Sequence, residues 1–214
     1  MSFTLYSAWR AGAPYRVRIG LNLKGVAYAY HAVDLVRGDQ RGPDYMAVNP
    51  QKLTPALDLG GGRVLTQSLA ILEWLEEEYP DPPILPVTSL DRQAVRAMAG
   101  IIACDIHPLN NTRVGRKLSK MGVDQPAIQD WIQGWIRDGF EALEPLVDRY
   151  GGGFAFGETP TIADCCLIPQ IYSANRFEVD LAPYPAIRAV GERAADHPAF
   201  RAAHPNQQPD AVLA

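Results

Sequence analysis

A proline-rich stretch at residues 80–86 constrains the fold of this 214-residue chain more than any other feature. It reads Pro-Asp-Pro-Pro-Ile-Leu-Pro, and four prolines in seven residues exclude a helix and favour an extended segment. Strand and helix patterns alternate before this stretch, whereas almost every pattern after it is helical. The sequence therefore predicts two domains, residues 1–80 and 88–214, joined by a linker at 81–87.

The first domain shows short strand patterns separated by helical ones. The strand patterns lie at 3–5, 28–33, 56–59 and 63–65, and the helical ones at 14–24 and 69–79. In the first helix, Val17 pairs with Leu21 and Ile19 with Leu23 at i,i+4 spacing, which indicates burial on more than one side. The order β-α-β, an irregular segment, then β-β-α is that of the thioredoxin-like α/β fold.

The second domain is predicted to be all-helical. Long helical patterns run from 91 to 120 and from 125 to 150, and three glycines at 151–153 end the second. Thr161 and Asp164 form a capping-box pattern, so a buried helix should begin there. Shorter helices follow Pro185 and Pro198, and the residues from Pro205 on are predicted to form a surface tail.

Composition excludes several classes of function. The net charge is −4, from 20 basic and 24 acidic residues, and no Lys/Arg stripe of the kind that binds nucleic acid is present. No apolar run approaches the roughly 18 residues that span a bilayer, and the N-terminus lacks a signal-peptide pattern. The three cysteines, Cys104, Cys165 and Cys166, form no CxxC pair, which favours reduced thiols and a cytoplasmic protein. No residues are assigned to a metal.

Residues 6–21 predict an anion site at the start of the first helix. A strand end passes through a turn that contains Gly12 into a helix, with Pro14 in the first turn and Gly25 just past the end. Such a helix directs spare N–H groups and a partial positive charge at whatever lies above its N-terminus. A thiolate or a carboxylate suits that position.

Several motifs along nearly the whole chain occur together in one known family. They are Trp9-Arg10 with Tyr15–Leu21, Val48–Leu57, Gln67–Ile71, Asp105–Asn111, Thr161–Cys165, Pro169-Gln170, Asn175–Leu181 and Pro183–Pro185. With these motifs in this order and spacing, the chain resembles the zeta class of glutathione transferases, which contains the maleylacetoacetate and maleylpyruvate isomerases. The resemblance implies a thioredoxin-like domain followed by an all-α domain, glutathione as the cofactor, and a homodimer.

The resemblance also implies which residues hold glutathione. Thr54, before a cis proline at Pro55, would pair its backbone with the cysteinyl peptide unit, because an extended edge reads a main chain regardless of side chains. Gln67 and Ser68 would hold the γ-glutamyl carboxylate. The remaining implied contacts are Gln40 and Gln51 at the glycyl end, and His107, Asn111 and Thr112 in the helical domain.

The resemblance implies that three arginines bind the substrate. Arg10, Arg113 and Arg176 stand where the maleylpyruvate isomerases direct side chains at a dicarboxylate, and the planar guanidinium binds a carboxylate with two hydrogen bonds. The implied reaction is cis–trans isomerisation of a maleyl dicarboxylate, either maleylpyruvate or maleylacetoacetate. The glutathione thiolate adds, the bond rotates, and elimination leaves the fumaryl isomer.

One segment departs from the zeta pattern. Where that class has hydroxyls and a cysteine (Ser-Ser-Cys-Ser), this chain has Ala-Gly-Ala-Pro at 11–14. The predicted replacements lie nearby: the N–H groups of Gly12 and Ala13, and the side chains of Ser7, Tyr6, Tyr15, Arg10 and Arg16. Among these side chains, Tyr6 or Ser7 is the predicted partner of the thiol. Two alternatives to the isomerase therefore stay open: a glutathione transferase or lyase acting on another electrophile, and a non-catalytic glutathione-binding dimer.

Overall fold

The computed structural model describes residues 3–212, which divide into two compact units. One unit comprises the residues up to Ile84 together with those from Ala195 on, and the other comprises Leu85–Ala194. This division falls within the segment 81–87 that the sequence predicts to be the linker. It differs from the predicted division at the C-terminal end, because the residues after 194 belong to the first unit.

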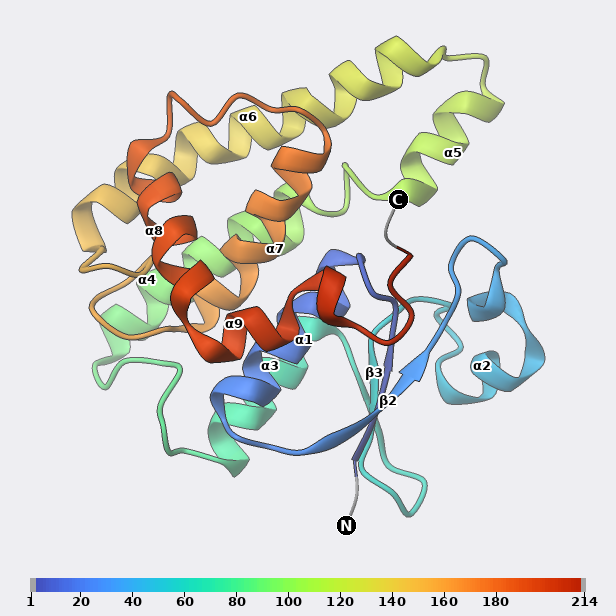
Figure 1. Ribbon diagram of the computed structural model, residues 1–214, viewed down its shortest axis with the longest axis horizontal. Helices are drawn as coiled ribbons and strands as arrows, with labels where there is room; N and C mark the ends of the chain where they lie inside the picture. The colour runs from blue at the N-terminus through green and yellow to red at the C-terminus, as the bar shows by residue number, and fades with distance from the viewer. Residues whose placement is uncertain (1–2, 213–214) are drawn as a thin grey trace. The chain divides into compact units, whose positions relative to one another are not determined.

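The first unit is built on a four-stranded mixed sheet (Figure 1). Its strands are β1 (Phe3–Ser7), β2 (Tyr28–Ala32), β3 (Ala56–Asp58) and β4 (Val64–Thr66), in the order β2-β1-β3-β4. β1 pairs in parallel with β2, and antiparallel with β3, which forms a hairpin with β4. This topology confirms the thioredoxin-like fold predicted from the alternating patterns.

Helices of the first unit pack against one another beside the sheet. α1 (Gly12–Leu23) contacts α3 (Ser68–Glu78) and α9 (Pro198–Ala203), and Figure 1 shows α9 alongside α1. Gly20 permits the close approach of α1 to α3, because a Cβ there would lie 2.3 Å from a methyl carbon of Leu72. The short helices η1 (Asp39–Arg41) and α2 (Pro43–Val48) precede β3.

The segment after α9 does not form the surface tail that the sequence predicts. It contains the short helix η3 (Pro205–Gln207), and both Pro205 and Gln208 are buried. The Gln208 Nε2 donates hydrogen bonds to the carbonyls of Ala202 (3.0 Å) and His204 (2.9 Å). These contacts fold the segment onto itself, so the prediction of a surface tail is wrong.

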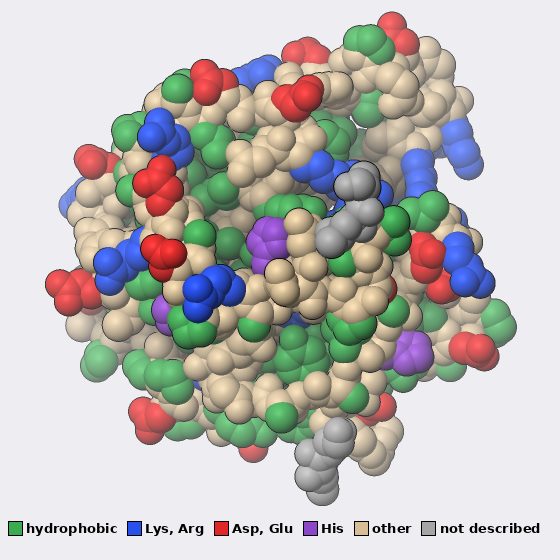
Figure 2. Space-filling view, viewed as in Figure 1, with side chains coloured by type: hydrophobic (Ala, Val, Ile, Leu, Met, Phe, Trp, Pro, Cys, Tyr) green, Lys and Arg blue, Asp and Glu red, His purple; other side chains and the backbone are tan. Residues whose placement is uncertain are grey.

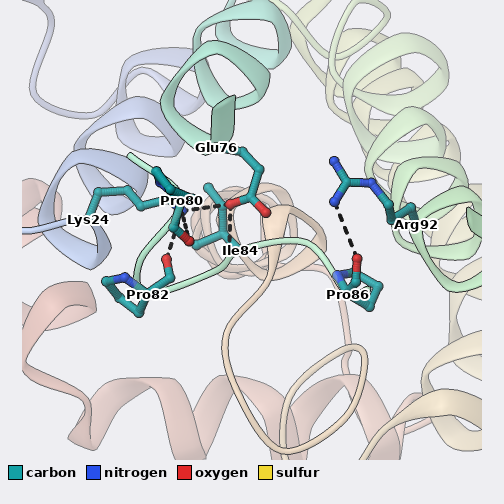
Figure 3. A network of polar contacts seen from close by, with 7 residues as sticks. All are labelled: Lys24, Glu76, Pro80, Pro82, Ile84, Pro86 and Arg92. Atoms are coloured by element: carbon teal, nitrogen blue, oxygen red, sulfur yellow. Dashed lines mark hydrogen bonds and ion pairs between the residues drawn. The ribbon is translucent and has the colours of Figure 1, made fainter. Parts of the chain in front are cut away.

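A buried ion pair fixes the start of the proline-rich stretch (Figure 3). Lys24, just after α1, donates through Nζ to Glu76 Oε2 (2.6 Å) and to the Pro82 carbonyl (2.7 Å). The same Glu76 oxygen accepts the Ile84 N–H (2.9 Å). Because both charged groups are buried, their pairing and the added hydrogen bonds offset the cost of desolvating them.

The second unit is helical. Its elements are α4 (Ser89–Gly100), the π-helical turn η2 (Ile101–Ile106), α5 (Thr112–Lys120), α6 (Gln125–Tyr150), α7 (Ile162–Arg176) and α8 (Pro185–Asp196), of which the residues from Ala195 on are counted with the first unit. The single helix predicted over 91–120 is wrong. The chain turns at 107–111, where Pro108 lacks an N–H for a continuing helix and Asn111 caps a new one.

The capping box predicted at the start of α7 is confirmed. The fully buried Asp164 carboxylate accepts hydrogen bonds from the Ala155 N–H (2.7 Å), the Thr161 N–H (2.8 Å) and the Thr161 hydroxyl (3.0 Å). Burial nevertheless raises the pKa of Asp164 to about 6, against the opposing effect of these hydrogen bonds. Cys165 and Cys166 beside it are buried, as predicted.

Among residues 3–212, no helix combines the length and the apolar character needed to cross a membrane.

Candidate functional site

The N-terminus of α1 carries backbone donors that no side chain caps. Ala11 stands at the N-cap position and has no side-chain oxygen, and Pro14 in the first turn has no N–H. The Ala11 N–H closes a turn onto the Ala8 carbonyl (3.1 Å). Within residues 3–212, nothing accepts a hydrogen bond from the N–H groups of Gly12 and Ala13. These two donors are therefore available to an anion above the helix.

Ser7, one of the two side chains predicted to replace the missing hydroxyls, faces the protein interior. It is fully buried, and its Oγ accepts a hydrogen bond from Arg18 Nη1 (3.0 Å). Ser7 is therefore excluded as a partner of a bound thiol in this conformation. Tyr6, the other candidate, is half-buried, and its ring lies 4.6 Å from that of His31.

Thr54 offers an unpaired stretch of backbone just before β3. The Thr54–Pro55 peptide bond is cis, as the resemblance implies. The neighbouring Leu53 carbonyl is held by the Tyr45 hydroxyl and the Asn49 side-chain amide, each at 2.7 Å. In the described chain, the Thr54 N–H and C=O form no hydrogen bond. A fixed backbone with free polar groups is suited to pairing with an extended peptide.

Gln51, Gln67 and Ser68 meet at the start of α3. Gln67 stands at the N-cap position with φ 66°, and its Nε2 donates to Gln51 Oε1 (2.8 Å). The buried Ser68 Oγ accepts a hydrogen bond from Arg16 Nη1 (3.3 Å). The structure thus brings together two residues that the sequence assigned to opposite ends of glutathione.

Arg16 is a residue whose contribution the sequence did not reveal. The sequence places Arg16 among the nearby replacements for the missing hydroxyls and favours a structural role for it, and it is buried on α1 with only 2% of its surface exposed. Because its guanidinium donates to Ser68 Oγ, the Ser68 hydroxyl hydrogen is left to donate to a ligand. Nothing in the spacing of residues 16 and 68 signals this contact.

Gln40 lies in η1 and is 8% exposed. Its Oε1 is buried and has no hydrogen-bond partner in the described part of the chain. Among these residues, no hydrogen bond joins Gln40 to Gln51 or to Gln67. A buried acceptor without a partner costs free energy, so a ligand donor at this point would be favourable.

Arg10 is exposed on the turn before α1, and its guanidinium carbon lies 5.1 Å from the centre of the Trp9 ring. This stacking restrains the side chain while leaving its charge accessible.

The other predicted residues belong to the second unit. His107 follows η2, and its backbone N–H donates to the Ile102 carbonyl (2.9 Å). Asn111 caps α5 by accepting the Arg113 N–H on Oδ1 (3.0 Å), and Thr112 is the first residue of that helix. Arg176 ends α7, where its guanidinium carbon lies 5.0 Å from the Phe177 ring.

Helix α5 presents an exposed basic surface. Figure 2 shows Lys and Arg side chains gathered over α5, at the upper right of the view. Its cations are Arg113, Arg116, Lys117 and Lys120, all exposed. A helix of this kind favours anions on its outer face.

The groups in the first unit fit the chemistry of glutathione. A free peptide edge suits its backbone, the Ser68 hydroxyl backed by Arg16 suits a carboxylate, and the α1 donors suit a thiolate. Among the described residues, no three His, Cys, Asp or Glu side chains cluster in a way that could hold a metal ion.

Comparison with known proteins identifies a consistent set of relatives. The glutathione S-transferase N-terminal domain matches residues 14–78, and the glutathione S-transferase C-terminal domain matches residues 129–206. A maleylpyruvate isomerase of Ralstonia sp. is 52% identical over 211 residues, which cover 97% of this chain and 99% of that protein.

Solved structures agree with these matches. A holo structure of a maleylpyruvate isomerase, described as a bacterial zeta-class glutathione transferase, is 51% identical with a TM-score of 0.95, covering 98% of this chain and 100% of that one. A maleylacetoacetate isomerase of Anaeromyxobacter dehalogenans with bound glutathione is 43% identical, with a TM-score of 0.90 and coverage of 99% and 98%. The latter isomerase has also been solved with dicarboxyethyl glutathione and citrate in its active site.

Proposed function

Because the chain belongs to the zeta class of the glutathione transferase family, we infer that it is a glutathione-dependent cis–trans isomerase of a maleyl dicarboxylate. Its substrate is maleylpyruvate or maleylacetoacetate, and its product is the fumaryl isomer. The observation that carries this inference is the 52% identity to a maleylpyruvate isomerase over 97% of the chain.

We assign glutathione to the first unit. The Thr54 backbone pairs with its cysteinyl peptide unit, while Gln67 and Ser68 hold the γ-glutamyl carboxylate. Gln40 and Gln51 contact the glycyl end of glutathione, and Gln51 is held by a hydrogen bond from Gln67. When bound, glutathione supplies a thiolate that adds reversibly to the maleyl double bond and thereby permits rotation about it.

The protein's own contribution begins at the thiol. The N–H groups of Gly12 and Ala13 lie at the positive end of α1 and stabilise a thiolate, which lowers the pKa of the thiol. They replace the hydroxyls and the cysteine of the zeta pattern. Backbone donors of this kind are preorganised, so they need no side-chain reorganisation to meet a charge.

We assign the binding of the maleyl acid to three arginines. Arg10, Arg113 and Arg176 are exposed, and each can hold a carboxylate or the oxygen on which negative charge develops during the reaction. His107, Asn111 and Thr112 contact glutathione or the acid. The planar guanidinium matches the geometry of a carboxylate, which suits arginine to this role.

We further propose a cytoplasmic homodimer. The three cysteines are free thiols in the structure, which suits a reducing compartment. Val87 and Leu90, before and at the start of α4, are 97% and 79% exposed, and such apolar side chains favour a subunit contact. Sedimentation of the purified protein at two concentrations would show a dimer mass; a monomer mass at both would contradict the proposal.

The experiment that tests the function is proton NMR of maleylpyruvate, and then of maleylacetoacetate, with a catalytic amount of protein. We expect the fumaryl isomer to appear only when glutathione is present, with no net loss of thiol. Accumulation of a stable thioether would instead identify a transferase, the alternative that the Ala-Gly-Ala-Pro turn leaves open. Bound glutathione without any change in either acid would show a non-catalytic protein.

A further inference from the structure

The C-terminal segment (residues 198–212) docks on α1 and reaches the turn that precedes it. The Asn22 side-chain amide donates to the Ala199 carbonyl (3.0 Å), and Arg18 Nε donates to the Ala203 carbonyl (3.0 Å). The ring of Tyr15 meets that of His204 edge-on, with centroids 6.2 Å apart. These contacts run along α1 from its last turn towards its first.

Near its end, the segment binds the turn itself through the side-chain carboxylate of Asp210. Asp210 Oδ2 accepts the Trp9 backbone N–H (3.2 Å), and Oδ1 accepts the Tyr30 hydroxyl (2.6 Å) from β2. The Trp9 carbonyl accepts a hydrogen bond from Arg18 Nη2 (2.7 Å). Both polar groups of the Trp9 backbone are thus held, one by the C-terminal segment and the other by α1.

Arg18 joins the two ends of this arrangement. Its side chain is fully buried, and it donates to Ser7 in β1, to Trp9 in the turn and to Ala203 in the C-terminal segment. A guanidinium with donors in a fixed fork holds three acceptors in one geometry. The turn cannot shift relative to β1 or α1 without breaking at least one of these hydrogen bonds.

The turn leads directly to the thiol-stabilising donors. Trp9 precedes Arg10, and only Arg10 and Ala11 separate it from Gly12. Because the Ala-Gly-Ala-Pro sequence offers no hydroxyl or thiol that could adapt to the ligand, the position of the backbone alone decides whether Gly12 and Ala13 meet the sulfur. Misplacing a reacting group by about 1 Å can cost on the order of 100-fold in rate.

We propose that Asp210 is a positioning residue of the isomerase: its carboxylate, with Arg18, fixes the Trp9 backbone and thereby places the Gly12 and Ala13 N–H groups against the glutathione thiol. This inference rests on the proposed function. It does not make Asp210 a catalytic residue, because Asp210 acts through the turn.

The test substitutes Asp210→Asn and measures the pKa of protein-bound glutathione from the ultraviolet absorbance of its thiolate. An asparagine of the same shape has a single, uncharged acceptor oxygen. Even where its amide donates to the Tyr30 hydroxyl, the charge-assisted hydrogen bond to the Trp9 N–H becomes a weaker, neutral one. We expect the thiol pKa to rise and kcat to fall ~10-fold, with the glutathione Kd changed less than about 3-fold, because the Thr54, Gln67 and Ser68 contacts remain.

The direction of the pKa change separates positioning from simple charge. Removing a negative charge near the thiol would by itself lower the thiol pKa, since a nearby anion disfavours a thiolate. A lower or unchanged thiol pKa in Asp210→Asn, with kcat as in the wild type, overturns the proposal.

Two further variants complete the design. Asn22→Ala removes a hydrogen bond between the C-terminal segment and α1 but leaves the contacts of Trp9 in place. It therefore serves as a control for the stability lost in Asp210→Asn, and it should leave the thiol pKa and kcat unchanged. Tyr30→Phe frees Asp210 Oδ1 but keeps the bond to Trp9, and it should shift both quantities in the same direction as Asp210→Asn by a smaller amount. If Asn22→Ala reproduces the Asp210→Asn effects, the role of Asp210 is only structural and the proposal is wrong.

Failure of this inference can be told apart from failure of the proposed function. A wild-type protein that leaves both maleyl acids unchanged contradicts the function. If the wild-type protein isomerises them and lowers the thiol pKa, and Asp210→Asn has the same thiol pKa and kcat as the wild type, only the role of Asp210 is contradicted.

Discussion

In the first unit, Arg16 and Arg18 lie buried along α1 and donate to side chains and carbonyls from distant parts of the chain. In the second unit, Arg113 and Arg176 are exposed at the ends of helices, and the unit's buried charged group is a helix cap, Asp164. The first unit therefore uses polar side chains to position backbone, whereas the second presents side chains directly. If the thiol lies at the start of α1, as we propose, this difference explains how Ala-Gly-Ala-Pro can serve there: the N–H groups of Gly12 and Ala13 need no side-chain hydroxyl.

The largest effect should come from the buried cap of the second unit. Asp164→Ala leaves two backbone N–H groups and the Thr161 hydroxyl without their acceptor, and we expect the free energy of unfolding to fall by about 4 kcal/mol. Urea denaturation followed by circular dichroism measures this. The exposed Asp180, whose Oδ1 accepts the Ala182 N–H, supplies the matched control Asp180→Ala, with a loss of less than about 1 kcal/mol. Equal losses in the two variants would contradict the importance of this cap.

The same carboxyl should make stability depend on pH. Its pKa is raised by burial to about 6 in the folded protein from 3.8, so the folded state binds the proton more tightly than the unfolded state. Stability from this group is therefore greatest below pH 4 and is lost as the pH rises to about 6, by roughly 3 kcal/mol. Urea midpoints between pH 4 and 7 in wild type and Asp164→Asn measure the difference. A parallel pH dependence in the two proteins would show that Asp164 does not titrate in this range.

Arg176→Ala sharpens the contrast between the units. We expect kcat/KM for the maleyl acid to fall about 100-fold, because a charged donor to a carboxylate is lost, with the glutathione Kd nearly unchanged. Steady-state kinetics and calorimetry measure the two quantities. Arg188, an exposed arginine of α8, offers the control Arg188→Ala. A collapse of glutathione binding with unchanged turnover per bound glutathione would show that Arg176 serves the cofactor.

In the first unit we expect the opposite result and a smaller one: a change in glutathione affinity with little change in kcat. Ser68→Ala removes a hydroxyl that Arg16 supports, and the glutathione Kd should rise about tenfold, while kcat at saturating glutathione changes little. Ser89→Ala, in the first turn of α4, serves as a control for the loss of a hydroxyl near a helix start. If Ser68→Ala lowers kcat with the Kd unchanged, Ser68 acts on the reaction and our assignment is wrong.

Sequence reasoning succeeded where the signal is local. The hydrophobic periods around Val17 and Leu21 and the capping box at Thr161 and Asp164 each report on a few neighbouring residues, and the structure bears out the helices that they predict. The prolines of 80–86 exclude a helix, and the structure has none in that stretch. The resemblance to the zeta class supplied the family and the cofactor. The assignment of individual glutathione and acid contacts stays a prediction.

The predictions that failed concern contacts between distant residues and the local course of the backbone. Nothing local distinguishes Asp210 from an aspartate on a loose tail, because its partners Trp9 and Tyr30 come from the other end of the chain. In the same way, the helical pattern over 91–120 continues through the residues where the structure has a π-helical turn and then a break after Pro108. Periodicity reports which side chains are apolar, and it cannot show which backbone hydrogen bonds shift register.

The central claim is that backbone N–H groups at the start of α1 suffice to activate the thiol. The most direct measurement is the pKa of glutathione bound to the wild-type protein, taken from the pH dependence of thiolate absorbance. We predict a value at least one unit below the ~8.5 of a free cysteine thiol. A bound thiol with the pKa of free glutathione, in a protein that still isomerises the maleyl acid, would contradict the claim and show that another group activates the thiol.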